Sequence, residues 1–313
     1  MLVYLDCDPG IDDALALGYL LAHPDVELAL IGSVSGNTDA ATAAANARDL
    51  LELFGHPEIP VAVGRTDFLS HPYSGGAPHV HGNNGIGGVQ LPGGAAPFAP
   101  GSAAEELVGL ARSRPGELHV LAIGPLTNLA VALEIDPELA SLVADVVVMG
   151  GAALAPGNVT AAAEANIHND PEAAAAVFAA GWDVTLVPLD ATMFQRFEQC
   201  DLDALLAGGP RAAALGRMLE TYYAFYTQHF GRPSSALHDP LAAAVLTGEA
   251  VVSRASRVPV VVDTGDGPGR GQTIAELRGR YRPVAPEHPE GVRVVFDIAD
   301  PFAPQLLARL LAL

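Results

Sequence analysis

Short apolar runs recur along the chain and alternate with segments of helical periodicity. The runs are rich in Val, Ile and Leu and are nearly continuous, as in strands of a parallel sheet that is buried on both faces. They are Leu2–Leu5, Leu28–Val34, Val61–Val63, His119–Ile123, Val146–Met149, Val184–Val187, Val260–Val262 and Val292–Phe296. Clear helical patterns between them are Asp12–Leu21, Ala40–Phe54, Ala103–Ala111 and Pro171–Ala180.

This alternation predicts an α/β fold: a single domain over residues 1–313 with a mostly parallel, Rossmann-like central sheet flanked by helices. Ligands of such sheets bind outside the carboxyl ends of the strands, so residues just after each run are the first site candidates. The segment 65–100 is rich in Gly, Pro and His and lacks a clear period, so we expect a mobile active-site loop there. The shorter segment 263–271 is expected to be an exposed turn.

Composition narrows the possible partners. The net charge is −20, which disfavours nucleic acids and anionic membranes. The sixteen basic residues are all arginine, so Schiff-base and P-loop lysine chemistry are excluded and a neutral small molecule is the expected substrate. Two cysteines, Cys7 and Cys200, make neither a disulfide framework nor a zinc cluster, and Cys7 is expected to be a small buried side chain. No signal-peptide pattern or apolar stretch of membrane-spanning length occurs, so a cytoplasmic location is expected.

The strongest chemical signal follows the first apolar run. The sequence Asp6-Cys7-Asp8-Pro9-Gly10-Ile11-Asp12-Asp13 places four carboxylates at the end of a strand, in a tight turn and in the first turn of a helix. Helix capping accounts for one or two of these aspartates but not for all four. A hard divalent cation, calcium or magnesium, accounts for the whole cluster because it prefers oxygen ligands.

This run resembles the signature of the inosine-uridine preferring nucleoside hydrolase family. Further motifs follow in the family's order along nearly the whole chain: Gly36-Asn37, Gly124-Pro125-Leu126-Thr127-Asn128, Val148-Met149-Gly150-Gly151-Ala152, Gly157-Asn158, Glu164-Ala165-Asn166, Asp170-Pro171-Glu172 and Leu237-His238-Asp239-Pro240. The resemblance implies a calcium-dependent enzyme that hydrolyses the N-glycosidic bond of ribonucleosides and works in nucleoside metabolism and salvage. Relatives are commonly dimers or tetramers, so it also implies a homo-oligomer.

The resemblance also implies roles for individual residues. Calcium would be held by Asp8, Asp13, the backbone carbonyl of Thr127 and Asp239, with Asp6 close behind. Asp8 would act as the general base toward a water whose pKa the cation lowers. The implied substrate contacts are Asp12, Asn37, His81, Met149, Asn158, Glu164, Asn166, Tyr226 and His238. Among them, Asn158 and Glu164 would hold the ribose 5′-hydroxyl and Asn166 the 3′-hydroxyl.

Several of these residues also have ordinary structural interpretations. Asn37 and the Thr127-Asn128 pair are suited to capping helices, and Asp170 is assigned to capping the helix that Pro171 starts. The leaving base would take a proton or a hydrogen bond from His238, from His81 or from solvent. Tyr222, Tyr223 and Tyr226 belong either to the core or to the base site. His79 and His81 lack a third soft ligand for zinc.

Two departures from the family pattern bear on specificity. Ala165 stands where many relatives have phenylalanine, and Asn84 replaces an acidic residue of the loop motif. His81 and His238 favour pyrimidine nucleosides slightly. Two rival interpretations are a calcium-dependent nucleoside-binding protein without activity, and a haloacid dehalogenase-type phosphatase. The second is disfavoured because Pro9-Gly10 follows the second aspartate and lysine is absent.

Overall fold

The centre of the molecule is an eight-stranded sheet in which all neighbours are parallel except the last pair. The computed structural model describes residues 1–281 and 288–313. In spatial order the strands are β3 (Val61–Ala62), β2 (Glu27–Ser33), β1 (Leu2–Cys7), β4 (Leu118–Ala122), β5 (Val143–Met149), β6 (Val184–Val187), β12 (Val292–Ile298) and β9 (Val252–Val258). The strand order reverses between β1 and β4, and this switch point is where a parallel sheet opens a crevice for a ligand.

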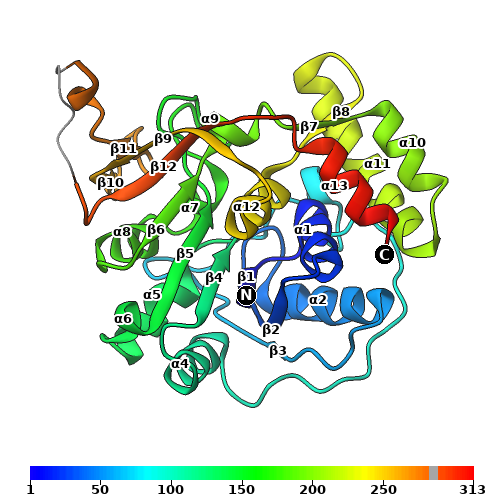
Figure 1. The fold of residues 1–313 in the computed structure, drawn as a ribbon, viewed down its shortest axis with the longest axis horizontal. Helices are drawn as coiled ribbons and strands as arrows, with labels where there is room; N and C mark the ends of the chain where they lie inside the picture. Colours follow the sequence, from blue (N-terminus) through cyan, green and yellow to red (C-terminus); the bar gives the residue numbers. More distant parts are fainter. Residues whose placement is uncertain (282–287) are drawn as a thin grey trace.

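Helices cover both faces of this sheet, as Figure 1 shows. One face shares its core with α1 (Ile11–Ala22), α2 (Ala40–Phe54), α9 (Leu189–Thr192), α10 (Gln199–Leu206), α11 (Pro210–Phe230), α12 (His238–Thr247) and α13 (Ala303–Leu311). The other shares its core with α4 (Ala103–Ser113), α5 (Thr127–Ile135), α6 (Leu139–Leu142), α7 (Ala165–Asn169) and α8 (Pro171–Ala179). Because successive side chains of a strand point to opposite faces, Val3 and Leu5 of β1 join the first core and Tyr4 joins the second.

The remaining elements lie outside the central sheet. Two small antiparallel pairs are β7 (Arg196–Glu198) with β8 (Ser234–Ala236), and β10 (Val260–Val262) with β11 (Thr273–Ala275). Two short helices, α3 (Pro78–His81) and the 3-10 helix Arg278–Tyr281, complete the described elements. No helix in the described residues is both long enough and apolar enough to cross a bilayer.

The predicted α/β fold with a mostly parallel sheet is confirmed, with differences at the C-terminal side. Val260–Val262 is a strand, but it belongs to the separate hairpin with β11 and not to the central sheet. The antiparallel edge strand β9 was not predicted, since its sequence Val-Ser-Arg-Ala-Ser-Arg-Val carries polar residues that an edge position tolerates. Cys7 is buried as expected, and residues 263–271 form the connection between β10 and β11.

Candidate active site

The candidate site lies at the carboxyl ends of the strands around the switch point. Asp6 and Asp8 mark the end of β1, Asn37 follows β2, Thr127 follows β4, and Met149 ends β5. These strands are neighbours in the sheet, so residues far apart in the sequence meet at one edge. The helices α1 and α12 pack against each other above this edge.

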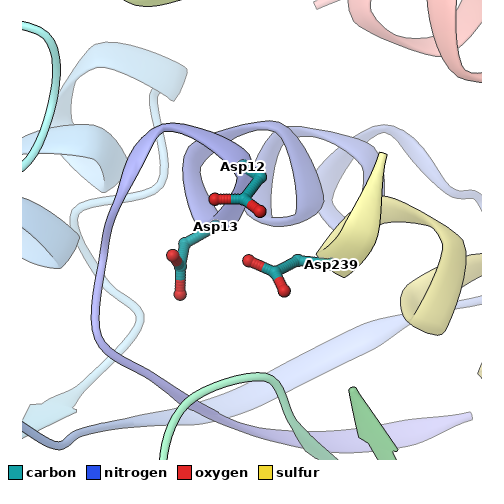
Figure 2. Close-up of side chains that lie close together, drawn as sticks. All are labelled: Asp12, Asp13 and Asp239. Carbon is teal, nitrogen blue, oxygen red and sulfur yellow. The ribbon is translucent and has the colours of Figure 1, made fainter. Parts of the chain in front are cut away.

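Three carboxylates gather where α1 and α12 begin. Asp12 and Asp13 lie in the first turn of α1, and Asp239 lies in the first turn of α12. Each offers an oxygen within 4.8 Å of the others, and all three side chains are buried. Figure 2 shows them directed toward a common space. None of the ion pairs found in the described part of the chain involves them, so no side-chain cation neutralises the group.

Asp8 borders this group and is held by the backbone. Its Oδ2 accepts a hydrogen bond from the backbone N–H of Asn37 at 2.5 Å, while Oδ1 has no hydrogen-bond partner. Asp13 is oriented by the turn that precedes α1, because its two oxygens accept from the N–H groups of Asp8 (3.2 Å) and Gly10 (2.8 Å). A Cβ at Gly10 would lie 2.6 Å from side-chain atoms of Asn37 and His81, so this close approach requires glycine.

Asp6 lies outside the group of three carboxylates and has hydrogen-bond partners of its own. Its Oδ2 accepts from the Tyr4 hydroxyl at 2.6 Å and from Asn128 Nδ2 at 3.0 Å, and its Oδ1 is buried without a partner. Asn128 also donates to the Ser33 carbonyl at 2.8 Å and accepts from the Arg65 N–H at 2.9 Å. Neither Tyr4 nor this bridging role of Asn128 was predicted, because only the tertiary contacts reveal them.

Burial makes negative charge in this cluster unfavourable. It raises the pKa of Asp6 and that of Asp13 each to about 7, Asp13 also being raised by the nearby charge of Asp12. Burial, with repulsion from neighbouring carboxylates, also raises the pKa of Asp8 and of Asp239 well above the ordinary value. A divalent cation removes this penalty, and the unpartnered oxygens of Asp8 and Asp12 are available to it. The all-oxygen donor set therefore fits a hard cation.

The predicted ligand set and the geometric group overlap without being identical. Asp13 and Asp239 belong to both, but the group also contains Asp12, which the resemblance assigned to the ribose. Thr127 begins α5, and its hydroxyl donates to Asp170 at 2.7 Å, which leaves its backbone carbonyl as the candidate ligand atom. Asp170 also caps α8, as predicted, by accepting from the Ala173 N–H.

A cavity of about 300 Å³ opens beside the carboxylates. Its lining includes all nine predicted substrate contacts: Asp12, Asn37, His81, Met149, Asn158, Glu164, Asn166, Tyr226 and His238. It also contains residues that were not assigned to the site: Ala77, His79, Val80, Ile123, Gly157, Val159, Met193, Tyr222, Phe225 and His229. Ala165 lines the wall as a methyl group, whereas Tyr223 faces away and donates to the Glu198 carbonyl.

One end of the cavity is polar. Glu164 caps α7 by accepting from the N–H groups of Asn166 and Ile167, and it also accepts from the Gly151 N–H. The amide of Asn166 donates to the carbonyls of Ile123 (2.8 Å) and Met149 (3.2 Å), which fixes that side chain. Glu164 and Asn166 are therefore buried and rigidly held, while Asn158 is exposed at the rim.

The other end of the cavity is lined by aromatic and imidazole rings. His81 comes from α3 in the long segment 65–100, and its Nδ1 accepts from the Ile11 N–H at 3.1 Å, so the proton of the neutral ring lies on Nε2. Burial lowers the pKa of His81 to about 3 and that of His238 to about 4. Both rings are neutral near pH 7 and act there as hydrogen-bond donors or acceptors, not as standing cations.

The sequence of the chain is similar to those of known nucleoside hydrolases. Residues 3–303 match the sequence profile of the inosine-uridine preferring nucleoside hydrolases. The "Probable uridine nucleosidase 1" of Oryza sativa subsp. japonica is 41% identical over 242 residues, 76% of this chain and 74% of the relative. The "Pyrimidine-specific ribonucleoside hydrolase RihA" of Salmonella enteritidis PT4 is 35% identical over 278 residues, 88% of each chain.

Solved structures agree over the full length. The "Plant nucleoside hydrolase - PpNRh1 enzyme" matches with a TM-score of 0.89 at 30% identity and covers 99% of this chain and 97% of that one. The "Purine-Preferring Ribonucleoside Hydrolase from Gardnerella vaginalis" matches with a TM-score of 0.90 at 29% identity, covering 100% of this chain and 98% of its own.

Proposed function

The chain belongs to the inosine-uridine preferring nucleoside hydrolase family, and we propose that it is a calcium-dependent ribonucleoside hydrolase that prefers pyrimidine nucleosides such as uridine. The observation that carries the proposal is a single cavity bounded by a buried acidic group at its base, fixed hydroxyl-binding groups at one end and aromatic rings at the other. A ribonucleoside has a matching set of groups: a C1′ reaction centre for the acidic group, ribose hydroxyls for the hydroxyl-binding groups and a flat base for the rings.

The donor set supports the choice of calcium. Asp8, Asp13, Asp239 and the Thr127 carbonyl would hold the cation, with Asp6 close behind. Every donor is oxygen, and calcium accepts carboxylate and carbonyl oxygens together in a flexible arrangement. When bound, the cation supplies Lewis acidity that lowers the pKa of water at the site.

The chain's own residues carry the remaining chemistry. Asp8, whose Oδ1 is free of hydrogen bonds, accepts the proton of the attacking water as general base. Asp12 and Asn166 hold the ribose hydroxyls, and Asn158 and Glu164 hold the 5′ end. Positive charge builds at C1′ as the glycosidic bond breaks, and the surrounding carboxylates stabilise that state more than the neutral substrate.

The departing base lies against the ring-lined end of the cavity. Tyr226 and His238 face it from α11 and α12, and His81 offers its Nε2–H from α3. Because His81 is neutral and uses Nδ1 as an acceptor, it donates a hydrogen bond to the base, and the neutral ring of His238 is the second candidate hydrogen-bond donor. The pyrimidine preference is supported by the names of the relatives in rice and Salmonella.

Ribose release from uridine, cytidine, inosine and adenosine tests this proposal. Each nucleoside is assayed after chelation and after adding back calcium, magnesium or zinc, with free ribose as the readout. We expect calcium to restore activity best, uridine or cytidine to react fastest, and D8A to lower turnover by about three orders of magnitude or more.

The matched control is D49N, which alters an aspartate that pairs with Arg48 outside the cavity. It should keep wild-type turnover. Nucleoside binding without any ribose release would instead support a binding protein, and equal rates after chelation would refute the metal requirement.

A further inference from the structure

The hydroxyl of Thr192 contacts His238 on the side of the ring away from Tyr226. Thr192 ends α9 and its side chain is fully buried. Its Oγ1 is 2.7 Å from Nδ1 of His238, while Nε2 of the same ring is 2.6 Å from the Tyr226 hydroxyl. Both ring nitrogens therefore have partners, and the two partners together decide which nitrogen carries the proton.

The two hydroxyls that face His238 differ in their surroundings. Tyr226 lines the cavity, so its hydroxyl proton can also be given to water or to a bound molecule. The Thr192 hydroxyl is fully buried and has no such choice. The Tyr226 oxygen can therefore accept a hydrogen bond from Nε2 without leaving its own proton unpaired.

The Thr192 hydroxyl therefore decides which ring nitrogen carries the proton. In residues 1–281 and 288–313, His238 Nδ1 is the only hydrogen-bond partner of the Thr192 hydroxyl. A buried hydroxyl proton without an acceptor is unfavourable, so Thr192 donates to Nδ1. Nδ1 is consequently unprotonated, and the proton lies on Nε2, the nitrogen that faces Tyr226.

We propose that Thr192 is a positioning residue that holds His238 in its Nε2–H form and fixes the plane of its ring toward the leaving base. The role of His238 toward the base rests on the function proposed above, whereas the tautomer rests on the hydrogen bonds alone. Groups that orient a functional histidine through its second nitrogen commonly change activity by about 10- to 100-fold when removed.

The kinetic test compares T192V and T192S with wild type on two leaving groups. Uridine needs a hydrogen bond or proton on its departing base, whereas the phenolate of 4-nitrophenyl β-D-ribofuranoside leaves without one. T192V should lower kcat for uridine about 10- to 100-fold but change the nitrophenyl riboside less than about threefold, and T192S should restore uridine turnover. Equal losses on both substrates, or no loss on either, would overturn the proposal.

A matched control lies on the same helix as His238. Thr247 ends α12 and its hydroxyl bonds Tyr19 and the Ala244 carbonyl, outside the cavity. T247V makes the same chemical change as T192V and should leave the ratio of the two substrates unchanged. A shift of that ratio in T247V equal to the shift in T192V would show that α12 packing, and not the Thr192 hydroxyl, controls His238.

A spectroscopic test is independent of activity. Long-range ¹H–¹⁵N correlation spectra distinguish protonated from unprotonated ring nitrogens, and H238Q assigns the His238 signals. Wild type should show a single Nε2–H tautomer, and T192V should show a mixture or a shifted Nδ1 signal. An Nδ1–H form in wild type would refute the inference even with an active enzyme. Failure of wild type to release ribose would refute the proposed function and leave this spectrum to decide the tautomer.

Discussion

Replacing Asn128 by alanine should destabilise the protein strongly although the residue lies behind the cavity. The side chain is fully buried and connects three segments: it donates to Asp6 and to the Ser33 carbonyl, and it accepts from the Arg65 N–H. N128A leaves the Ser33 carbonyl and one contact of the Asp6 carboxylate unsatisfied in the interior. The Arg65 N–H is partly exposed and can form a hydrogen bond with water instead, so the loss of this bond should reduce stability least.

The magnitude follows from these three groups. A lost hydrogen bond to a buried carboxylate costs about 2 kcal/mol, and the orphaned buried carbonyl about 1 to 2 kcal/mol. With a small contribution from Arg65, the free energy of unfolding should fall by about 4 kcal/mol. Urea unfolding of the chelated protein, followed by circular dichroism, measures this change.

Asn84 provides the control because it also makes three hydrogen bonds, to the backbone of Ile86, Gly88 and Val89. It is only half-buried in the segment 65–100, so water replaces the lost partners and N84A should cost about 1 kcal/mol or less. If both variants lose the same stability, or if N128A loses less than about 1 kcal/mol, burial is not what makes the Asn128 bonds valuable.

Three other predictions concern the metal and the rim of the cavity. D13N should abolish calcium binding in titration calorimetry and lower ribose release by at least about 10³-fold; retained binding would remove Asp13 from the ligand set. The folded pKa values of Asp6 and Asp13 are raised from 3.8 to about 7, so the metal-free fold loses stability as the pH rises between these values. Calcium should therefore increase Tm more at pH 8 than at pH 5.5. An equal increase at both pH values would contradict the assigned shifts. Asp190 accepts hydrogen bonds from the N–H groups of Ala153, Leu154 and Ala155 in the loop that leads to Asn158. D190A should therefore raise KM for uridine about 10-fold with little change in kcat. A lowered kcat with an unchanged KM would show that this loop acts on the chemical step.

The sequence alone predicted the fold class, and its resemblance to the family named nine of the residues that line the cavity. Nearly continuous apolar runs predicted a parallel sheet, and the carboxyl ends of those runs pointed to Asp8, Asn37, Thr127 and Met149 before any contact was known. This works because strand burial and site position in a parallel sheet both depend on local pattern and chain order. The aspartate run stands out for the same reason, since four nearby carboxylates are unfavourable without a cation.

Only the tertiary structure decided which groups support these residues. Thr192 meets His238 at 2.7 Å, and Tyr4 and Asn128 meet Asp6, although each partner is an ordinary threonine, tyrosine or asparagine in the sequence. Asp12 likewise joins Asp13 and Asp239 only because α1 and α12 begin side by side. Val260–Val262 was expected to follow the pattern of the other apolar runs, but its pairing with β11 depends on a distant chain segment. Side-chain hydrogen bonds and strand partners are long-range contacts, and local hydrophobic pattern carries no information about which distant groups will meet.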